Sequence, residues 1–154
     1  MLMLHTGLRV SEVSNLRIGD VSISPRKGEI VVRGGKGEKF RTVPLNSNVR
    51  NALKAYLSVR PSVNHDHLFV GQRGERLRPT GIYYLVKRYA YDARIESISP
   101  HTLRHTFGKN LVDAGVPLDR VATLLGHSSL NTTCIYTVPS QADLQDAVER
   151  IATG

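Results

Sequence analysis

Two histidines and one arginine fall at helical spacing in the segment HTLRH, residues 101–105. Pro100 favours the start of a helix at this point. On that helix His101, Arg104 and His105 occupy positions i, i+3 and i+4, so their side chains project from one face. The apolar residues mark another face with the spacing of a buried stripe: Leu103, Phe107, Leu111 and Ala114. We therefore expect a helix that packs on one side and offers cationic donors on the other.

A third histidine and a tyrosine follow this helix in the sequence. Residues 118–125 predict a second helix, which Gly126 closes, because glycine readily turns a chain out of a helix in the left-handed conformation. His127 stands just beyond this stop, and Tyr136 follows after a short polar segment. We expect this phenol and this imidazole to lie near the arginine and the histidines of the first helix.

Arg9 begins another predicted helix and is a second candidate cation. Val10, Val13 and Leu16 have the helical spacing that would bury one side of it. Glu12 lies one turn after Arg9 and is placed to brace its guanidinium group. Taken alone, the pair is more typical of a surface ion pair, which contributes little stability.

From residue 20 to residue 45 the pattern changes from helices to strands. Residues 29–33 are β-rich, residues 40–43 form a second candidate strand, and the intervening glycines indicate a hairpin tip. The tip carries Lys36 and Lys39. Such a charged tip is in most proteins simply solvated.

Helical patterns occupy the rest of the chain. Asn46 is a candidate cap for a scaffold helix that ends before Pro61. We find neither a repeat nor an internal linker. The sequence thus predicts one domain of the α+β class, mainly α, with a helical body and a small antiparallel β-sheet near the N-terminus.

A further helix is predicted from Thr80, and basic residues lie on it and in the loop before it. Arg73 belongs to the loop, whereas Lys87 and Arg88 lie on the helix beside tyrosines. Basic residues next to aromatic ones suit a helix that contacts a nucleic-acid groove, although a solvated helix face explains each of them equally well. The apolar spacing predicts a buried face: Ile82, Leu85, Val86, Tyr89 and Ala93.

The charge of the chain points to a polyanionic partner. There are 21 Lys and Arg residues against 13 Asp and Glu residues, so the formal net charge is +8. Nucleic acid is favoured over an anionic membrane, because no stretch approaches the roughly 20 apolar residues of a membrane span. The single cysteine, Cys134, has no partner for an internal disulfide, which suits a reducing compartment. We therefore expect a cytoplasmic protein.

Five motifs in this order resemble the tyrosine recombinases, also called phage integrases: TGLRVSE at 6–12, GGKGEK at 34–39, HTLRH at 101–105, LLGH at 124–127, and Tyr136. The resemblance covers almost the whole chain. It implies that residues 1–154 form the catalytic domain, truncated at its N-terminus and without the separate core-binding domain that clamps DNA in this family.

The resemblance also implies a role for each matched residue. Tyr136 would attack a DNA phosphate and form a covalent 3′-phosphotyrosine, while His101 accepts its proton. Arg9 and Arg104 would grip the non-bridging oxygens, and His127 would add a further donor. Because arginines neutralise the charge, neither a metal nor another cofactor is expected.

The hairpin lysines and the remaining polar residues have supporting roles. Lys36 is the better match to the lysine that protonates the departing 5′ oxygen in this family, and Lys39 is the alternative. Glu12 would brace Arg9, and His105 would help to pack the site as a hydrogen-bonded core histidine. Contacts with DNA are expected from four residues: Lys39, Arg73, Lys87 and Arg88.

The expected partners are double-stranded DNA and, in the full-length protein on DNA, further copies of the chain in a tetramer. For this fragment we expect a monomer, with the amphipathic helix predicted at residues 140–152 docked on its own chain.

Three other interpretations compete. A zinc site of His101, His105 and His127 is disfavoured, because Thr102 stands where a metalloprotease has glutamate and Arg104 would repel a cation. A DNA-binding fragment without cleavage activity is the second alternative. An enzyme similar to type IB topoisomerases is the third.

Overall fold

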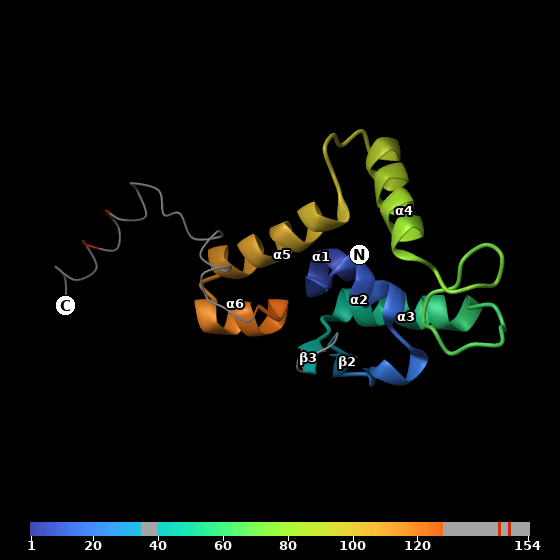
Figure 1. Ribbon diagram of the computed structural model, residues 1–154. Coiled ribbons are helices and arrows are strands. Elements are labelled where there is room, and N and C mark those ends of the chain that lie inside the picture. Colours follow the sequence, from blue (N-terminus) through green and yellow to red (C-terminus); the bar gives the residue numbers. More distant parts are fainter. Residues whose placement is uncertain (35–39, 128–144, 146–147, 149–154) are drawn as a thin grey trace.

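The computed structural model describes residues 1–34, 40–127, 145 and 148. Some predicted features lie outside the described residues: Lys36, Lys39, Tyr136 and the helix expected at residues 140–152. The described elements are α1 (Leu2–Thr6), α2 (Val10–Asn15), the 3-10 helix η1 (Ile18–Asp20), β1 (Val21–Ile23), β2 (Gly28–Val32), β3 (Arg41–Pro44), α3 (Ser47–Val59), α4 (Pro79–Asp92), α5 (Pro100–Asp113) and α6 (Leu118–Leu125) (Figure 1). This confirms the predicted α+β class with a small antiparallel sheet.

The sheet has the strand order β1-β2-β3, and both of its pairs are antiparallel. Ile30 pairs with Val43, and Val32 pairs with Arg41. The three apolar members of these pairs are buried, whereas Thr42 is exposed, so the strands alternate between an inner and an outer face. By the same alternation Arg41 lies on the inner face, at the start of β3.

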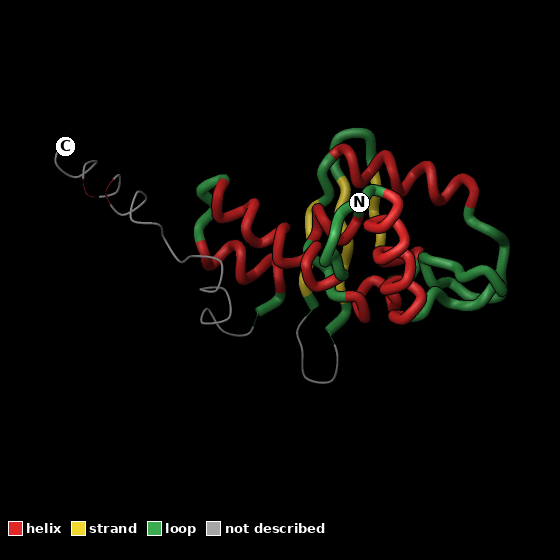
Figure 2. The backbone as a smooth tube through the Cα atoms, turned by 90° about the horizontal axis from the view of Figure 1, so that it is seen from above, coloured by secondary structure: helices red, strands yellow, loops and turns green. Residues whose placement is uncertain are grey.

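The inner face of the sheet joins a core to which the helices contribute. Its buried residues outside the sheet are Met3, Leu8, Val13, Leu16, Leu45, Val49, Leu53, Leu68 and Ile82. Figure 2 shows the strands with helices on more than one side. Asn46 caps α3 as predicted, since its side-chain oxygen accepts the backbone N–H of Val49 at 3.0 Å.

Gly7 ends α1 with a left-handed φ of 64°. A β-carbon at this residue would lie 2.4 Å from Phe107 of α5 and 2.8 Å from Leu125 of α6. Glycine is therefore required here both for the turn and for the close approach of three helices. Through this contact the N-terminal segment meets the HTLRH and LLGH segments.

The predicted buried face of α4 is only partly correct. Ile82 and Ala90 are buried and Val86 is half-buried, whereas Leu85 and Tyr89 are 40% and 68% exposed. In Figure 1, most of α4 stands away from the other helices. Only one line of residues, at i, i+4 and i+8, has a neighbour to pack against. Ala93, also predicted to be buried, follows the last residue of α4 and is exposed.

The buried line of α5 differs from the predicted stripe. It runs through Pro100, Arg104 and Gly108, whereas Leu103, Phe107 and Leu111 are half-buried beside it. Ala114, at the end of the helix, is exposed. The side that meets α1 and α6 is thus rotated towards Arg104. The prediction that Arg104 projects away from the packed side is wrong.

Candidate active site

Arg9 immediately precedes the first turn of α2 and has an extended backbone, with φ −70° and ψ 152°. Its backbone N–H donates to Glu12 Oε2 at 2.7 Å, and its Nη1 donates to Glu12 Oε1 at 3.2 Å. A glutamate at the third helical position commonly accepts this backbone N–H. The structure thus has the predicted contact between Glu12 and the Arg9 guanidinium.

Arg104 is 5% exposed and reaches from α5 to the ends of two other helices. Its Nη1 donates to the backbone carbonyl of Gly7, and its Nη2 donates to that of Leu125 at 2.7 Å. Carbonyls at helix C-termini lack a partner within the helix and carry the negative end of its dipole, so they stabilise a buried cation. These hydrogen bonds explain why an arginine can occupy an inward-facing position of α5.

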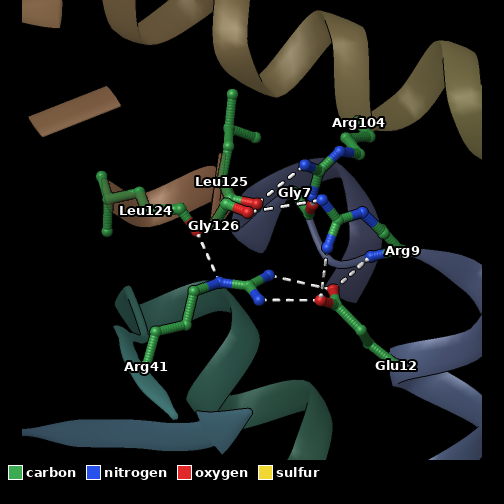
Figure 3. Close-up of polar contacts among 8 residues, drawn as sticks. All are labelled: Gly7, Arg9, Glu12, Arg41, Arg104, Leu124, Leu125 and Gly126. Carbon is green, nitrogen blue, oxygen red and sulfur yellow. Dashed lines mark hydrogen bonds and ion pairs between the residues drawn. The ribbon is translucent and has the colours of Figure 1, made fainter. Parts of the chain in front are cut away.

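Three consecutive carbonyls at the end of α6 accept hydrogen bonds from three different arginines (Figure 3). Leu124 O accepts from Arg41 Nε at 3.1 Å, Leu125 O from Arg104, and Gly126 O from Arg9 Nη2 at 3.4 Å. Gly126 ends α6 with φ 66°, which confirms the predicted helix stop. The LLGH segment therefore gathers arginines from β3, α5 and the start of α2.

Sequence reasoning missed Arg41. Its Nη1 and Nη2 donate to Glu12 Oε1 and Oε2 at 2.7 and 2.9 Å, and its side chain is only 11% exposed. One signal was present in the sequence. If Thr42 points outward and Val43 inward, then Arg41 must also point inward, and a buried cation needs a partner.

Glu12 is the carboxylate on which this cluster depends. Burial on its own raises the pKa of Glu12, but hydrogen bonds from Arg41 and from the Arg9 backbone, with both arginine charges, hold that pKa below its ordinary value. The carboxylate is therefore ionised at neutral pH. Two of the three guanidinium groups, those of Arg9 and Arg41, donate to this carboxylate (Figure 3).

His127 follows the end of α6 directly and is half-buried. Burial lowers the pKa of its imidazole, and the charges of Arg104, Arg9 and Arg41 lower that pKa further. At neutral pH the imidazole is therefore mainly uncharged and can donate one N–H to an anion. The charges of all three arginines therefore act on the His127 ring.

The other predicted histidines are placed differently. His101 is exposed on the first turn of α5, one turn before Arg104. His105 is also exposed, so its expected place in the core is wrong. The reason is the rotation of α5, which turns the side that carries both histidines towards solvent.

The basic residues around α4 line an open hollow of about 570 Å³. Arg73 and Arg88 both border it, together with Arg76, Arg78 and Tyr84. Lys87 instead lies over the Tyr83 ring, with Nζ 5.7 Å from the ring centroid. These residues form a basic and aromatic surface, as the sequence indicates.

Metal-binding clusters and membrane-spanning helices are both absent from the residues that the structure describes. In this part of the chain, no group of three or more His, Cys, Asp and Glu side chains is arranged to hold a metal ion. No described helix is long and apolar enough to cross a membrane.

The arrangement of the cluster is suited to binding an oxyanion, because planar guanidinium groups match the geometry of phosphate oxygens and three of them meet at the end of α6. Comparison with known proteins agrees with this chemistry. Residues 1–142 match the model of the phage integrase family. The chain belongs to this family. The resemblance of the sequence motifs is thereby confirmed.

Two of the similar proteins are named tyrosine recombinases. The chain is 42% identical over 153 residues to tyrosine recombinase XerA of Thermococcus kodakarensis, covering 97% of this chain and 53% of that protein. It is 39% identical over 157 residues to tyrosine recombinase XerC of Thermodesulfovibrio yellowstonii, covering 96% of this chain and 50% of the relative. The chain thus spans about half the length of the curated relatives it matches.

Solved structures share the fold. The crystal structure of XerA recombinase has a TM-score of 0.85 at 34% identity and covers 97% of this chain and 55% of its own. The XerH site-specific recombinase bound to its difH substrate, a pre-cleavage complex, has a TM-score of 0.81 at 34% identity, covering 96% of this chain and 44% of its own.

Proposed function

We propose that this chain is the catalytic domain of a site-specific DNA recombinase that cleaves and rejoins double-stranded DNA through a covalent 3′-phosphotyrosine. Its similarity to XerA, and to XerH bound to a difH substrate, supports this activity. One observation supports the proposal most directly. Arg9 and Arg104 are far apart in the sequence, yet both donate hydrogen bonds to carbonyls at the end of α6, beside His127.

The reaction begins at the phenol of Tyr136. Its oxygen attacks the scissile phosphorus, the bond from phosphorus to the 5′ oxygen breaks, and the phosphate stays attached to the tyrosine. The phenol proton passes to His101, and Lys36 gives a proton to the departing 5′ oxygen, with Lys39 as the alternative donor. The covalent bond stores the energy of the broken one, so a 5′ hydroxyl can reseal the strand by the reverse steps.

Arg9 and Arg104 act on the non-bridging oxygens of the phosphate. Negative charge increases on these oxygens in the pentavalent transition state, so fixed cationic donors stabilise that state more than the ground state. Loss of one such donor raises the barrier by roughly 3 kcal/mol. His127 adds an N–H donor, and the arginines supply the charge neutralisation that metal ions provide in other phosphoryl transfers.

The basic surface around α4 contacts the DNA backbone and bases. Arg73, Lys87 and Arg88 lie there, and Lys39 adds a contact from the hairpin. On DNA, copies assemble as a tetramer, whereas the chain alone is a monomer. The proposed place of action is the cytoplasm, where the net charge of +8 favours association with DNA.

A nicked suicide DNA substrate tests the proposal, because loss of a short 5′ fragment after cleavage traps the covalent complex. The unchanged chain should form a protein–DNA adduct that survives denaturing electrophoresis. Tyr136→Phe removes only the nucleophilic hydroxyl, so it should bind the DNA with nearly unchanged affinity and form no adduct. DNA binding without any adduct from the unchanged chain would favour a binding fragment, and an adduct from Tyr136→Phe would refute the assigned nucleophile.

A further inference from the structure

Arg41 occupies an unusual position for a charged residue. It begins β3 on the inner face of the sheet, opposite the buried Val32, while its neighbours Phe40 and Thr42 are exposed. Phe40 is 70% exposed, so the strand presents a cation inward and an aromatic ring outward. This reverses the usual preference, and such a placement is stable only when partners satisfy the buried guanidinium.

All three guanidinium nitrogens of Arg41 have protein partners. Nη1 and Nη2 form a bidentate pair with the carboxylate of Glu12, and Nε donates to the carbonyl of Leu124. A bidentate pair fixes both the distance and the orientation of the carboxylate. Arg41 is therefore a rigid link between β3, the first turn of α2 and the end of α6 (Figure 3).

The same carboxylate holds Arg9. Glu12 Oε1 accepts from Arg41 Nη1 and from Arg9 Nη1, and Oε2 accepts from Arg41 Nη2 and from the Arg9 backbone N–H. The Glu12 side chain is 9% exposed, so without Arg41 it would be a buried anion with half of these donors. Its carboxylate would then rotate or draw in water, and the Arg9 guanidinium would lose its fixed support.

The end of α6 also depends on Arg41. A β-carbon at Gly126 would lie 2.7 Å from Arg41 Nη1 and 2.8 Å from its Cζ, so the guanidinium packs directly on this glycine. Two residues earlier, the carbonyl of Leu124 accepts a hydrogen bond from Arg41 Nε. His127 follows Gly126 directly, so the position of its ring depends on how this turn is held.

We propose that Arg41 is a positioning residue for DNA cleavage: it holds Glu12 and the last turn of α6, and through them the Arg9 guanidinium and the His127 ring. The proposal rests on the proposed function and deepens it. Arg41 acts through these two contacts and not by gripping the scissile phosphate itself. Because catalysis is sensitive to displacements of about 1 Å, its loss should slow cleavage by about 10- to 100-fold.

The test compares two arginines that differ in location but whose guanidinium nitrogens all have protein partners. Arg60 also donates to main-chain carbonyls, those of His65, His67 and Leu68, but it has no contact with the cluster. Arg41→Lys and Arg60→Lys both keep the charge and lose the planar fork. For each variant, thermal unfolding, DNA affinity and the single-turnover rate on suicide DNA at saturating concentration are measured well below the unfolding temperature.

We expect both variants to unfold at lower temperature than the unchanged chain and to bind DNA with nearly unchanged affinity. Only Arg41→Lys should slow cleavage by about 10- to 100-fold. Equal cleavage rates in Arg41→Lys and the unchanged chain would overturn the positioning role, as would equal slowing in Arg60→Lys. If Arg41→Lys fails to fold, Arg41→Gln, which retains an amide donor, is measured in the same way and judged by the same outcomes.

A double-mutant cycle tests the route of the effect. If Arg41 acts through Glu12, then Arg41→Lys combined with Glu12→Gln should be much less impaired than the product of the two single losses. Fully multiplicative losses would overturn this route. Absence of an adduct from the unchanged chain would instead refute the proposed function, so the two failures are distinguishable.

Discussion

Three arginines lie close together in this molecule because each guanidinium donates to oxygens of the chain. Arg41 binds Glu12, Arg104 binds the carbonyls of Gly7 and Leu125, and Arg9 shares Glu12 and the Gly126 carbonyl. These bonds offset the mutual repulsion of the charges and fix their orientation before any substrate arrives. Such preorganised charge costs no reorganisation during the reaction.

The protonation of His127 should depend on the three arginines near it. The pKa of its imidazole should lie below the ordinary value of about 6.5 in the DNA-free protein, because of burial and the nearby arginines. A bound phosphodiester should raise it by opposing those charges. Ring signals followed by NMR across pH, with Tyr136→Phe bound to DNA and His127→Gln for assignment, would show this. A value at or above the ordinary one without DNA would contradict it.

We expect Lys36 to be the proton donor to the departing 5′ oxygen. DNA in which sulfur replaces the bridging 5′ oxygen has a leaving group that needs no proton. It should therefore restore cleavage by Lys36→Ala but not by Arg104→Ala. Comparing single-turnover rates on both DNAs provides the measurement. Rescue of Lys39→Ala in place of Lys36→Ala would assign the role to the other lysine.

At the scale of elements, the end of α6 is where distant segments meet. Its last carbonyls have no N–H partner within the helix, because the helix ends there. They accept hydrogen bonds from Arg41 of β3, Arg104 of α5 and Arg9 before α2. Gly126 contributes to this arrangement in two ways. Its left-handed φ of 66° ends the helix, and its lack of a side chain leaves space for the Arg41 guanidinium.

Two glycine substitutions separate these contributions. Gly115 also has a left-handed backbone, with φ 75°, but no atom lies within 4 Å of a β-carbon built on it. Gly115→Ala and Gly126→Ala should each lose about 1–2 kcal/mol of stability from backbone strain. Only Gly126→Ala should also slow cleavage, since its β-carbon displaces Arg41. Denaturant unfolding and suicide-DNA rates provide both readouts, and equal rates in the two variants would contradict this explanation.

The exposed face of α4 leads to a prediction about binding. Lys87→Ala and Arg88→Ala should weaken DNA binding and reduce the slope of log affinity against log salt by about 1 for each phosphate that the variant no longer neutralises. The ion pair of Arg88 with Asp92 spans 4.0 Å between exposed groups, so its loss should not unfold the helix. Lys54→Ala, on α3, is the control that removes the same charge from another exposed site. An unchanged slope in the α4 variants would exclude DNA binding by this face.

At the scale of the whole molecule, the sequence predicts elements better than it predicts their rotation. The helix stop at Gly126 and the cap at Asn46 are local signals, and the structure confirms them. The burial of Arg104 and the exposure of Tyr89 depend on which neighbour each helix meets, which periodicity alone does not specify. The Arg41 contacts join residues 29 and 83 positions apart, so no local pattern contains them.

In the proposed reaction, two arginines that come from distant segments stabilise charge on the scissile phosphate. Replacing one non-bridging oxygen of that phosphate with a methyl group removes the charge and leaves the DNA otherwise intact. On ordinary suicide DNA, Arg9→Ala and Arg104→Ala should each cleave about 100-fold more slowly than the unchanged chain. On the neutral methylphosphonate DNA these losses should shrink to less than about tenfold, because less charge remains to be stabilised. Equal losses on both DNAs would show that the arginines maintain only the fold, and would contradict their proposed role in catalysis.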